Sequence, residues 1–135
     1  MTIEAMLDAN LCIRVLRDRP QAISARFIAE APNLAISTIV LYELRHGAQR
    51  SQRPAHQHAL IDDFAAHITV MDFDPNASLH AAQIKAELEV KGNIIGPNDL
   101  LIAGHARSLS LKLITGNLRE FTRVDGLRCE DWLAQ

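Results

Sequence analysis

Short apolar runs alternate with longer segments of helical periodicity along this chain, and this alternation constrains the fold more than any other feature. The apolar runs at residues 3–7, 34–36, 68–71, 111–115 and 127–129 predict strands. Strands that alternate with helices pair in parallel through right-handed crossovers. We therefore expect the α/β class, with a three-layer α/β/α sandwich around a short parallel sheet of about four to five strands.

Helical spacing of apolar residues between these runs predicts helices at 10–17, 21–31, 38–47, 54–67, 75–90 and 99–108. The helix at 75–90 carries apolar residues on two sides. We expect one stripe to face inwards, formed by Leu79, Ala82, Ala86 and Val90. Ile84 and Leu88 would then cover a neighbouring helix or meet a second copy of the chain.

At 135 residues the chain suits one domain, which we place at residues 1–135. Hydrophobic residues make up 48% of it but aromatic residues only 4%, so the core must be mainly aliphatic. The first residues are too few and too acidic for a signal peptide, and no apolar run approaches the ~18 residues that cross a bilayer. The sequence therefore predicts a cytoplasmic protein that makes no membrane contact.

The net charge of −2 argues against binding of nucleic acid by bulk electrostatics, because few phosphates would be neutralised. Arginine side chains can still surround an acidic pocket, and their guanidinium groups match phosphate oxygens in bidentate geometry. Arg14, Arg45 and Arg119 are candidates for contacts with RNA. Solvated surface charge is the alternative for each of them.

Three acids interrupt the most apolar segments of the chain. Asp8 follows the first predicted strand, Glu43 lies within a helical segment, and Asp99 opens the helix at 99–108. A carboxylate in such surroundings needs a partner, a raised pKa or a metal. Taken singly, Asp8 and Asp99 also fit helix N-termini, and Glu43 fits an exposed helix position.

Taken together, the three acids sit where strand ends and helix starts meet at one edge of a parallel sheet, which is where such sheets bind ligands. Clustered carboxylates repel each other unless a cation joins them. Mg²⁺ prefers hard oxygen ligands and is held by a few carboxylates together with substrate phosphate. The pattern therefore favours metal-dependent hydrolysis of a phosphodiester.

Four segments of the chain resemble, in order and spacing, the PIN-domain ribonuclease toxins of the VapC type. They are residues 6–10 (MLDAN), 42–47 (YELRHG), 95–103 (IGPNDLLIA) and 115–121 (TGNLREF). The resemblance covers nearly the whole chain. It implies a PIN-like fold and an active site whose metal-binding acids match Asp8, Glu43 and Asp99 by position.

The resemblance also assigns residues around these acids. Many members carry an Asp where this chain has Asn117, and Glu120 takes the acidic role here, so the catalytic set becomes Asp8, Glu43, Asp99 and Glu120. Asn10, Thr115 and Asn117 match positions that support the carboxylates. A family threonine is replaced by Ala9, which removes one hydroxyl beside Asp8.

The activity implied by the resemblance is that of an endoribonuclease using Mg²⁺, with Mn²⁺ as the alternative, on structured RNA such as the anticodon stem-loop of a tRNA. It further implies a cognate VapB-like antitoxin, a homodimer, and a hetero-oligomer with the antitoxin. Two other functions stay open. The chain could be a catalytically weakened PIN-like protein that only binds RNA or antitoxin, or a phosphatase-like hydrolase of small phosphate esters.

Overall fold

The fold is built on a parallel sheet of five strands in the order β3-β2-β1-β4-β5, seen in a computed structural model that describes residues 2–17 and 21–132. The strands are β1 (Ala5–Leu7), β2 (Leu34–Ser37), β3 (Thr69–Met71), β4 (Lys112–Thr115) and β5 (Cys129–Asp131). Every neighbouring pair is parallel. The prediction of a short parallel sheet is confirmed, although β5 begins two residues later than the apolar run suggested.

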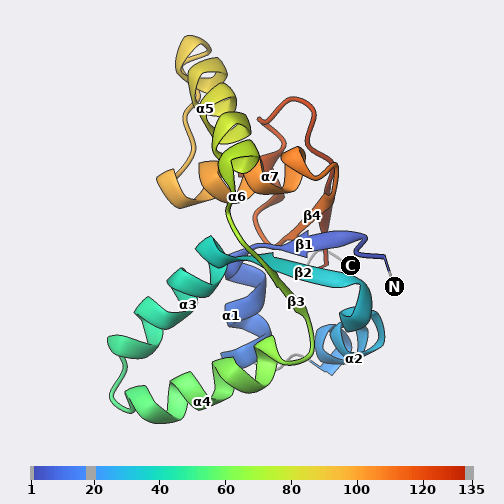
Figure 1. Cartoon of the computed structure of the whole chain (residues 1–135), viewed down its shortest axis with the longest axis vertical. Coiled ribbons are helices and arrows are strands. Elements are labelled where there is room, and N and C mark those ends of the chain that lie inside the picture. Colours follow the sequence, from blue (N-terminus) through green and yellow to red (C-terminus); the bar gives the residue numbers. More distant parts are fainter. Residues whose placement is uncertain (1, 18–20, 133–135) are drawn as a thin grey trace.

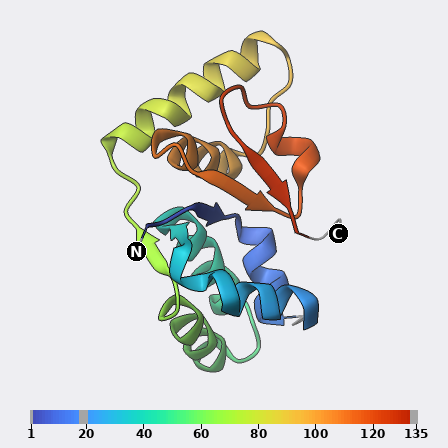
Figure 2. The same cartoon turned by 90° about the vertical axis from the view of Figure 1, so that its right-hand side faces the viewer.

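Helices cover both faces of the sheet (Figures 1 and 2). One layer holds α1 (Ala9–Arg17), α2 (Gln21–Glu30), α3 (Thr38–Gln49) and α4 (Pro54–Ala65), with the 3-10 turn η1 (Ala31–Asn33) before β2. The other layer holds α5 (Pro75–Val90), α6 (Pro97–Ser108) and the short α7 (Leu118–Phe121). The predicted three-layer α/β/α sandwich is therefore confirmed, whereas α7, which is only four residues long, was not predicted.

The central strands are buried on both faces because helices cover them from either side. All three residues of β1 are buried, as are Leu113, Ile114 and Thr115 of β4, whereas the edge strands β3 and β5 contain no buried residue. The polar residues that follow β1 and β4 consequently lie close to the middle of the molecule. In the described part of the chain, no helix has the length and apolar character needed to span a membrane.

The inward face of α5 is the opposite of the one predicted. Its buried residues are Ala77, Ala81, Ile84 and Leu88. Leu79 is 55% exposed and Val90 is 89% exposed, and Ala82 and Ala86 are exposed as well. The reason lies in the packing of α5 on α6: a Cβ at Gly104 would stand 2.5 Å from the backbone nitrogen of Ala81. The close approach of Gly104 to Ala81 places this face of α5 against α6, and it buries Ile84 and Leu88 as well.

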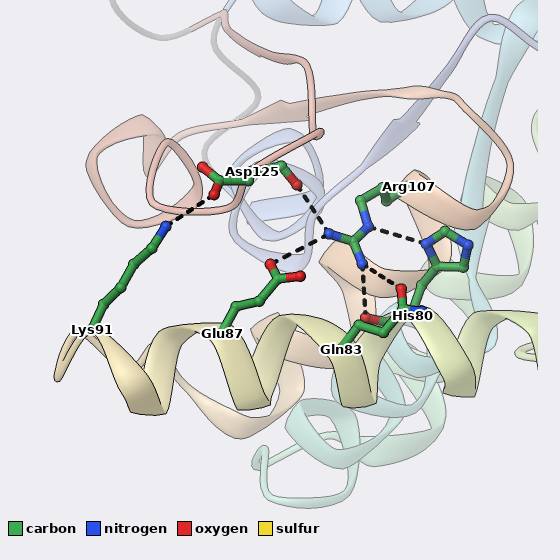
Figure 3. Close-up of polar contacts among 6 residues, drawn as sticks. All are labelled: His80, Gln83, Glu87, Lys91, Arg107 and Asp125. Carbon is green, nitrogen blue, oxygen red and sulfur yellow. Dashed lines mark hydrogen bonds and ion pairs between the residues drawn. The ribbon is translucent and has the colours of Figure 1, made fainter.

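Arg107 of α6 joins this helix pair to the segment that precedes β5 (Figure 3). Its Nε donates to His80 Nδ1 at 3.0 Å, and its Nη2 donates to Gln83 Oε1 at 2.9 Å on α5. Its Nη1 donates to the carbonyl of Asp125 at 3.0 Å and lies 3.8 Å from the carboxylate of Glu87. Because one guanidinium holds two elements, the position of α6 is fixed at its carboxyl end.

Candidate active site

Asp8 lies directly after β1 and is only 2% exposed. Its Oδ1 accepts a hydrogen bond from the backbone N–H of Leu11 at 2.9 Å, and its Oδ2 accepts one from the hydroxyl of Thr115. Burial raises the pKa of Asp8 to about 6; the two hydrogen bonds oppose this rise, and the negative charge of Glu43 adds to it. Asp8 is therefore both the cap of α1 and a crowded carboxylate.

Glu43 is carried by α3, whose start is fixed by Ser37. The Ser37 hydroxyl accepts from the backbone N–H of Ile39 at 3.1 Å and also bonds the buried ring of His105 at 2.7 Å. Glu43 Oε1 accepts from Asn98 Nδ2 at 3.0 Å. Glu43 Oε2 is buried, and among the described residues it has no hydrogen-bond partner. An oxygen left in this state is costly unless a proton or a cation reaches it.

Asp99 and Glu120 form a close pair of carboxyl groups between α6 and α7. Glu120 Oε1 accepts from the backbone N–H of Gly96 at 2.8 Å, and its Oε2 accepts from Asn117 Nδ2 at 2.7 Å. The pKa of Asp99 is raised to about 7, first by burial, then by its hydrogen bond to Glu120 and by the charges of Glu120, Glu43 and Asp8. A Cβ at Gly96 would lie 3.2 Å from Asp99 Oδ2, so glycine leaves room for the pair.

The structure thus gathers the four predicted acids at the carboxyl ends of β1 and β4, and each influences the charge of another. Within residues 2–17 and 21–132, no three His, Cys, Asp or Glu side chains lie close enough as they stand to share one ion. The acids are instead held in place by neighbouring donors. Shared binding of a cation would therefore require these side chains to exchange protein partners for the ion.

The donor set nevertheless fits a hard divalent cation. All four side chains offer carboxylate oxygens, and Glu43 Oε2 is buried without a partner among the described residues. The pKa values of Asp8 and Asp99 are raised first by burial and then further by neighbouring acids. Oxygen-only sites of this kind suit Mg²⁺ or Mn²⁺. Asp8, Glu43 and Asp99 would hold the ion, and Glu120, held by Gly96 and Asn117, would complete the acidic set beside Asp99.

Of the three residues predicted to support the carboxylates, Thr115 and Asn117 contact them, whereas Asn10 only lines a cavity beside Glu43. Thr115 connects Asp8 to Asn117, because its hydroxyl donates to Asp8 and accepts from the backbone N–H of Asn117 at 2.7 Å. Asn117 in turn orients Glu120. Asn10 is exposed on the first turn of α1 and lines a cavity beside Glu43.

Two neighbours of the site escaped sequence analysis. Asn98, which orients Glu43, was interpreted only as part of a helix start, although an amide next to a candidate acid is a usable signal. Asp131 adds negative charge near Asp8 from the carboxyl end of β5. It meets the same strand-end criterion as Asp8, but the strand was predicted to end at residue 129, before Asp131.

The three candidate arginines have different surroundings. Arg45 is held against α4, where it bonds the ring of His58 at 3.1 Å, the carbonyl of His58 at 3.2 Å, and the carboxylate of Asp62. These contacts give Arg45 a structural role between α3 and α4. Arg14 and Arg119 are exposed on α1 and α7.

A cavity of about 470 Å³ opens beside Glu43; we call it the polar cavity. It is bounded by the start of α1, by one side of α3 and by the start of α6. Its lining residues are Ala9, Asn10, Ile13, Tyr42, Glu43, His46, Gly47, Arg50 and Asn98. Glu43 is one of the four acids and also lines the polar cavity, as does Asn98, which bonds it. The polar cavity and the acids therefore form one continuous site.

Comparison with known proteins agrees with this combination of fold and acids. Residues 5–127 match the family model of the PIN domain. The class that the fold and the site define is therefore that of PIN-domain proteins.

The most informative relatives are VapC proteins of nearly the same length. The chain is 45% identical over 130 residues to the tRNA(fMet)-specific endonuclease VapC of Shigella flexneri, covering 96% of this chain and 98% of that protein. It is 44% identical over 131 residues to Ribonuclease VapC2 of Haemophilus influenzae, covering 97% and 99%. The crystal structure of DNA-bound VapBC from Salmonella typhimurium superposes with a TM-score of 0.93 at 43% identity, covering 96% and 98%. The chain belongs to the VapC family of PIN-domain ribonucleases, the toxins of VapBC toxin-antitoxin systems.

Proposed function

We propose that this ribonuclease depends on Mg²⁺ and cleaves a tRNA in its anticodon stem-loop, which arrests translation. The observation that carries the proposal is the meeting of Asp8, Glu43, Asp99 and Glu120 at the sheet edge, with one buried Glu43 oxygen that lacks a partner among the described residues. Such a site has the ligands for a divalent cation and opens into a polar cavity.

In this proposal the protein's side chains position both the cation and the RNA. When bound, Mg²⁺ would supply a Lewis acid that activates water and offsets charge on the scissile phosphate. Thr115 holds Asp8 in one orientation, and Asn98 does the same for Glu43. Burial, followed by the hydrogen bond and charge of Glu120, raises the pKa of Asp99 to about 7, which limits charge repulsion among the acids.

The substrate class follows from the relatives. Those from Shigella flexneri and Salmonella typhimurium are named tRNA(fMet)-specific endonucleases, and both are more than 40% identical to this chain over nearly its full length. An initiator tRNA is therefore the first substrate to test. We place the protein in the cytoplasm, where its substrate is found.

The partner in this proposal is a VapB-like antitoxin encoded with the toxin. The similar structures from Salmonella typhimurium, Rickettsia felis and Haemophilus influenzae are VapBC complexes. An antitoxin tail that places an Arg among the four acids would gain charge-assisted hydrogen bonds and block the RNA. We also propose that the toxin forms a homodimer, and a hetero-oligomer with the antitoxin.

Purified protein incubated with total tRNA tests the activity directly. Cleavage is expected in Mg²⁺ and not in EDTA, and it should be absent with Asp99→Asn although that variant unfolds at an unchanged or higher temperature. Cleavage that persists in EDTA would contradict a metal-dependent mechanism. An inert wild type that still binds RNA would favour the weakened binding protein, and turnover of small phosphate esters without RNA cleavage would favour the phosphatase.

A further inference from the structure

Tyr42 and His46 form an exposed pair of parallel rings on the wall of the polar cavity. Their ring centroids lie 6.4 Å apart with an interplanar angle of 8°, and Tyr42 is 57% exposed. By contrast, Phe27, Phe64 and Trp132 are buried. In a chain with few aromatic residues, an aromatic face turned to solvent beside the acids is available to a ligand that stacks.

A positively charged side chain, that of Arg50, lies on the same side of α3. Arg50 follows His46 by four residues, as His46 follows Tyr42, so the three side chains lie on one face of the helix. All three line the polar cavity. Arg50 is exposed, and within the described chain its guanidinium has no hydrogen-bond or ion-pair partner. The Tyr42–His46 ring pair therefore has a phosphate-binding group, the Arg50 guanidinium, beside it on the same cavity wall.

The remaining walls carry polar groups beside the apolar Ala9 and Ile13, and they adjoin the reacting centre. Asn10 contributes a wall from α1, and Asn98 and Glu43 contribute the side that is shared with the four acids. A volume of about 470 Å³ lies within the range of sites that take a small ligand. The neighbouring cavity of about 620 Å³ differs, since Leu44, Leu60 and Ile61 line it. The polar cavity thus suits a nucleotide better than an apolar side chain of a protein.

We propose that the polar cavity is a subsite for one unpaired nucleotide of the RNA, next to the scissile phosphate. Its base stacks on the exposed Tyr42 ring, which is itself stacked with His46, and Arg50 binds a phosphate of that nucleotide. Base stacking on an aromatic ring strengthens single-strand binding without reading the sequence, so the subsite selects for an unpaired base. This inference rests on the proposed RNA-cleaving function and adds where the substrate lies.

Binding of a fluorescein-labelled single-stranded RNA tetranucleotide, measured by anisotropy in EDTA, tests the subsite apart from cleavage. Tyr42→Leu should weaken binding roughly tenfold, whereas Tyr42→Phe, which keeps the ring, should bind within about twofold of wild type. A tetranucleotide series with one abasic position should contain a member for which wild type and Tyr42→Leu bind equally.

Arg50→Gln should weaken binding and lower the salt dependence by about one ion. Arg53→Gln, an exposed arginine outside the cavity, is the matched control and should change neither.

Cleavage kinetics with tRNA and Mg²⁺ separate the subsite from the activity itself. Tyr42→Leu should raise KM with kcat little changed, because stacking contributes binding rather than chemistry. A wild type that cleaves tRNA while Tyr42→Leu binds the tetranucleotide equally well would overturn the subsite and leave the proposed function intact. An equal loss for Tyr42→Leu and Tyr42→Phe, or a loss confined to antitoxin binding or dimerisation, would also overturn it. A wild type that neither cleaves tRNA nor binds the tetranucleotide would overturn both.

Discussion

Asp8 has two separable roles, because each of its carboxylate oxygens meets a different partner. Oδ1 caps α1 through Leu11, while Oδ2 bonds Thr115 beside the other acids. A substitution that removes the charge therefore differs from one that removes the side chain. Asp99 makes no comparable helix-capping bond among the described residues. Burial and its contact with Glu120 raise its pKa.

The first prediction separates charge from capping. Asp8→Asn and Asp99→Asn should each lower the rate of RNA cleavage at least about a hundredfold, as expected for loss of a positioned catalytic group. Asp8→Ala should also lose the cap and about 1 kcal/mol of unfolding free energy, whereas Asp99→Ala should unfold with the same or higher stability. Urea unfolding and tRNA cleavage measure both. Equal stability of Asp8→Ala and Asp99→Ala would show that the cap contributes nothing.

The second prediction ranks the two acids of the close pair. Glu120 is bonded by Gly96 and Asn117, so it serves partly to hold the site together, whereas Asp99 faces Glu43 and Asp8 as well. Glu120→Gln should therefore reduce cleavage less than Asp99→Asn does. The two rates, measured at saturating Mg²⁺ on one tRNA, decide the order, and a greater loss for Glu120→Gln would reverse our assignment.

At the scale of elements, the site depends on where α3 and α6 stand relative to the sheet, because these helices carry Glu43 and Asp99. The buried bond between Ser37 and His105 joins the start of α3 to the last turn of α6. Burial lowers the pKa of His105, which favours the neutral ring in the core. The close contact of Gly104 with Ala81 then packs α6 against α5.

The third prediction tests that helix contact with two glycine substitutions. Gly104→Ala places a methyl 2.5 Å from the Ala81 backbone, which cannot yield as a side chain would, so unfolding free energy should fall by about 1–3 kcal/mol. Gly47→Ala, inside α3 with nothing within 4 Å of the added carbon, should gain about 0.5–1 kcal/mol. Chemical denaturation measures both. A neutral Gly104→Ala would mean that α5 and α6 can separate freely.

At the scale of the whole molecule, the crowded acids link folding to pH. Asp8 and Asp99 have pKa values of about 6 and 7 in the folded chain, against the ordinary value of 3.8. The folded protein therefore binds more protons than the unfolded chain across this interval. The stability that these protons provide is present below about pH 4 and is lost as the pH rises towards 7.

The fourth prediction follows from that linkage. The melting temperature of Asp99→Asn minus that of wild type, both in EDTA, should increase as the pH rises from 4.5 to 7.5, because only wild type loses a proton from this position. The comparison cancels the opposing contribution of His105, which is shared. Mg²⁺ at pH 7.5 should raise the melting temperature of wild type more than that of Asp99→Asn. A constant difference across the pH range would show that Asp99 is not held near neutral.

Local patterns in the sequence were enough for the parallel α/β order and for Asp8, Glu43 and Asp99 as candidates. Strand and helix periods are properties of neighbouring residues, and an acid in an apolar segment stands out without knowledge of the fold. The apolar stripes on the two sides of the helix at 75–90 could not be ranked in this way. Both are apolar, and the wrong one was predicted to face inwards.

Tertiary structure decided how those acids are paired and which faces are buried. The inward face of α5 is the one that meets Gly104 through Ala81. The bonds from Asn98 to Glu43 and from Gly96 to Glu120, and the attachment of Arg45 to α4, depend on packing between elements. The sequence by itself determined which residues could bear the chemistry, because their types and periods are local. Which of them meet was decided only by close packing, because contact between distant segments depends on the shape of the whole molecule.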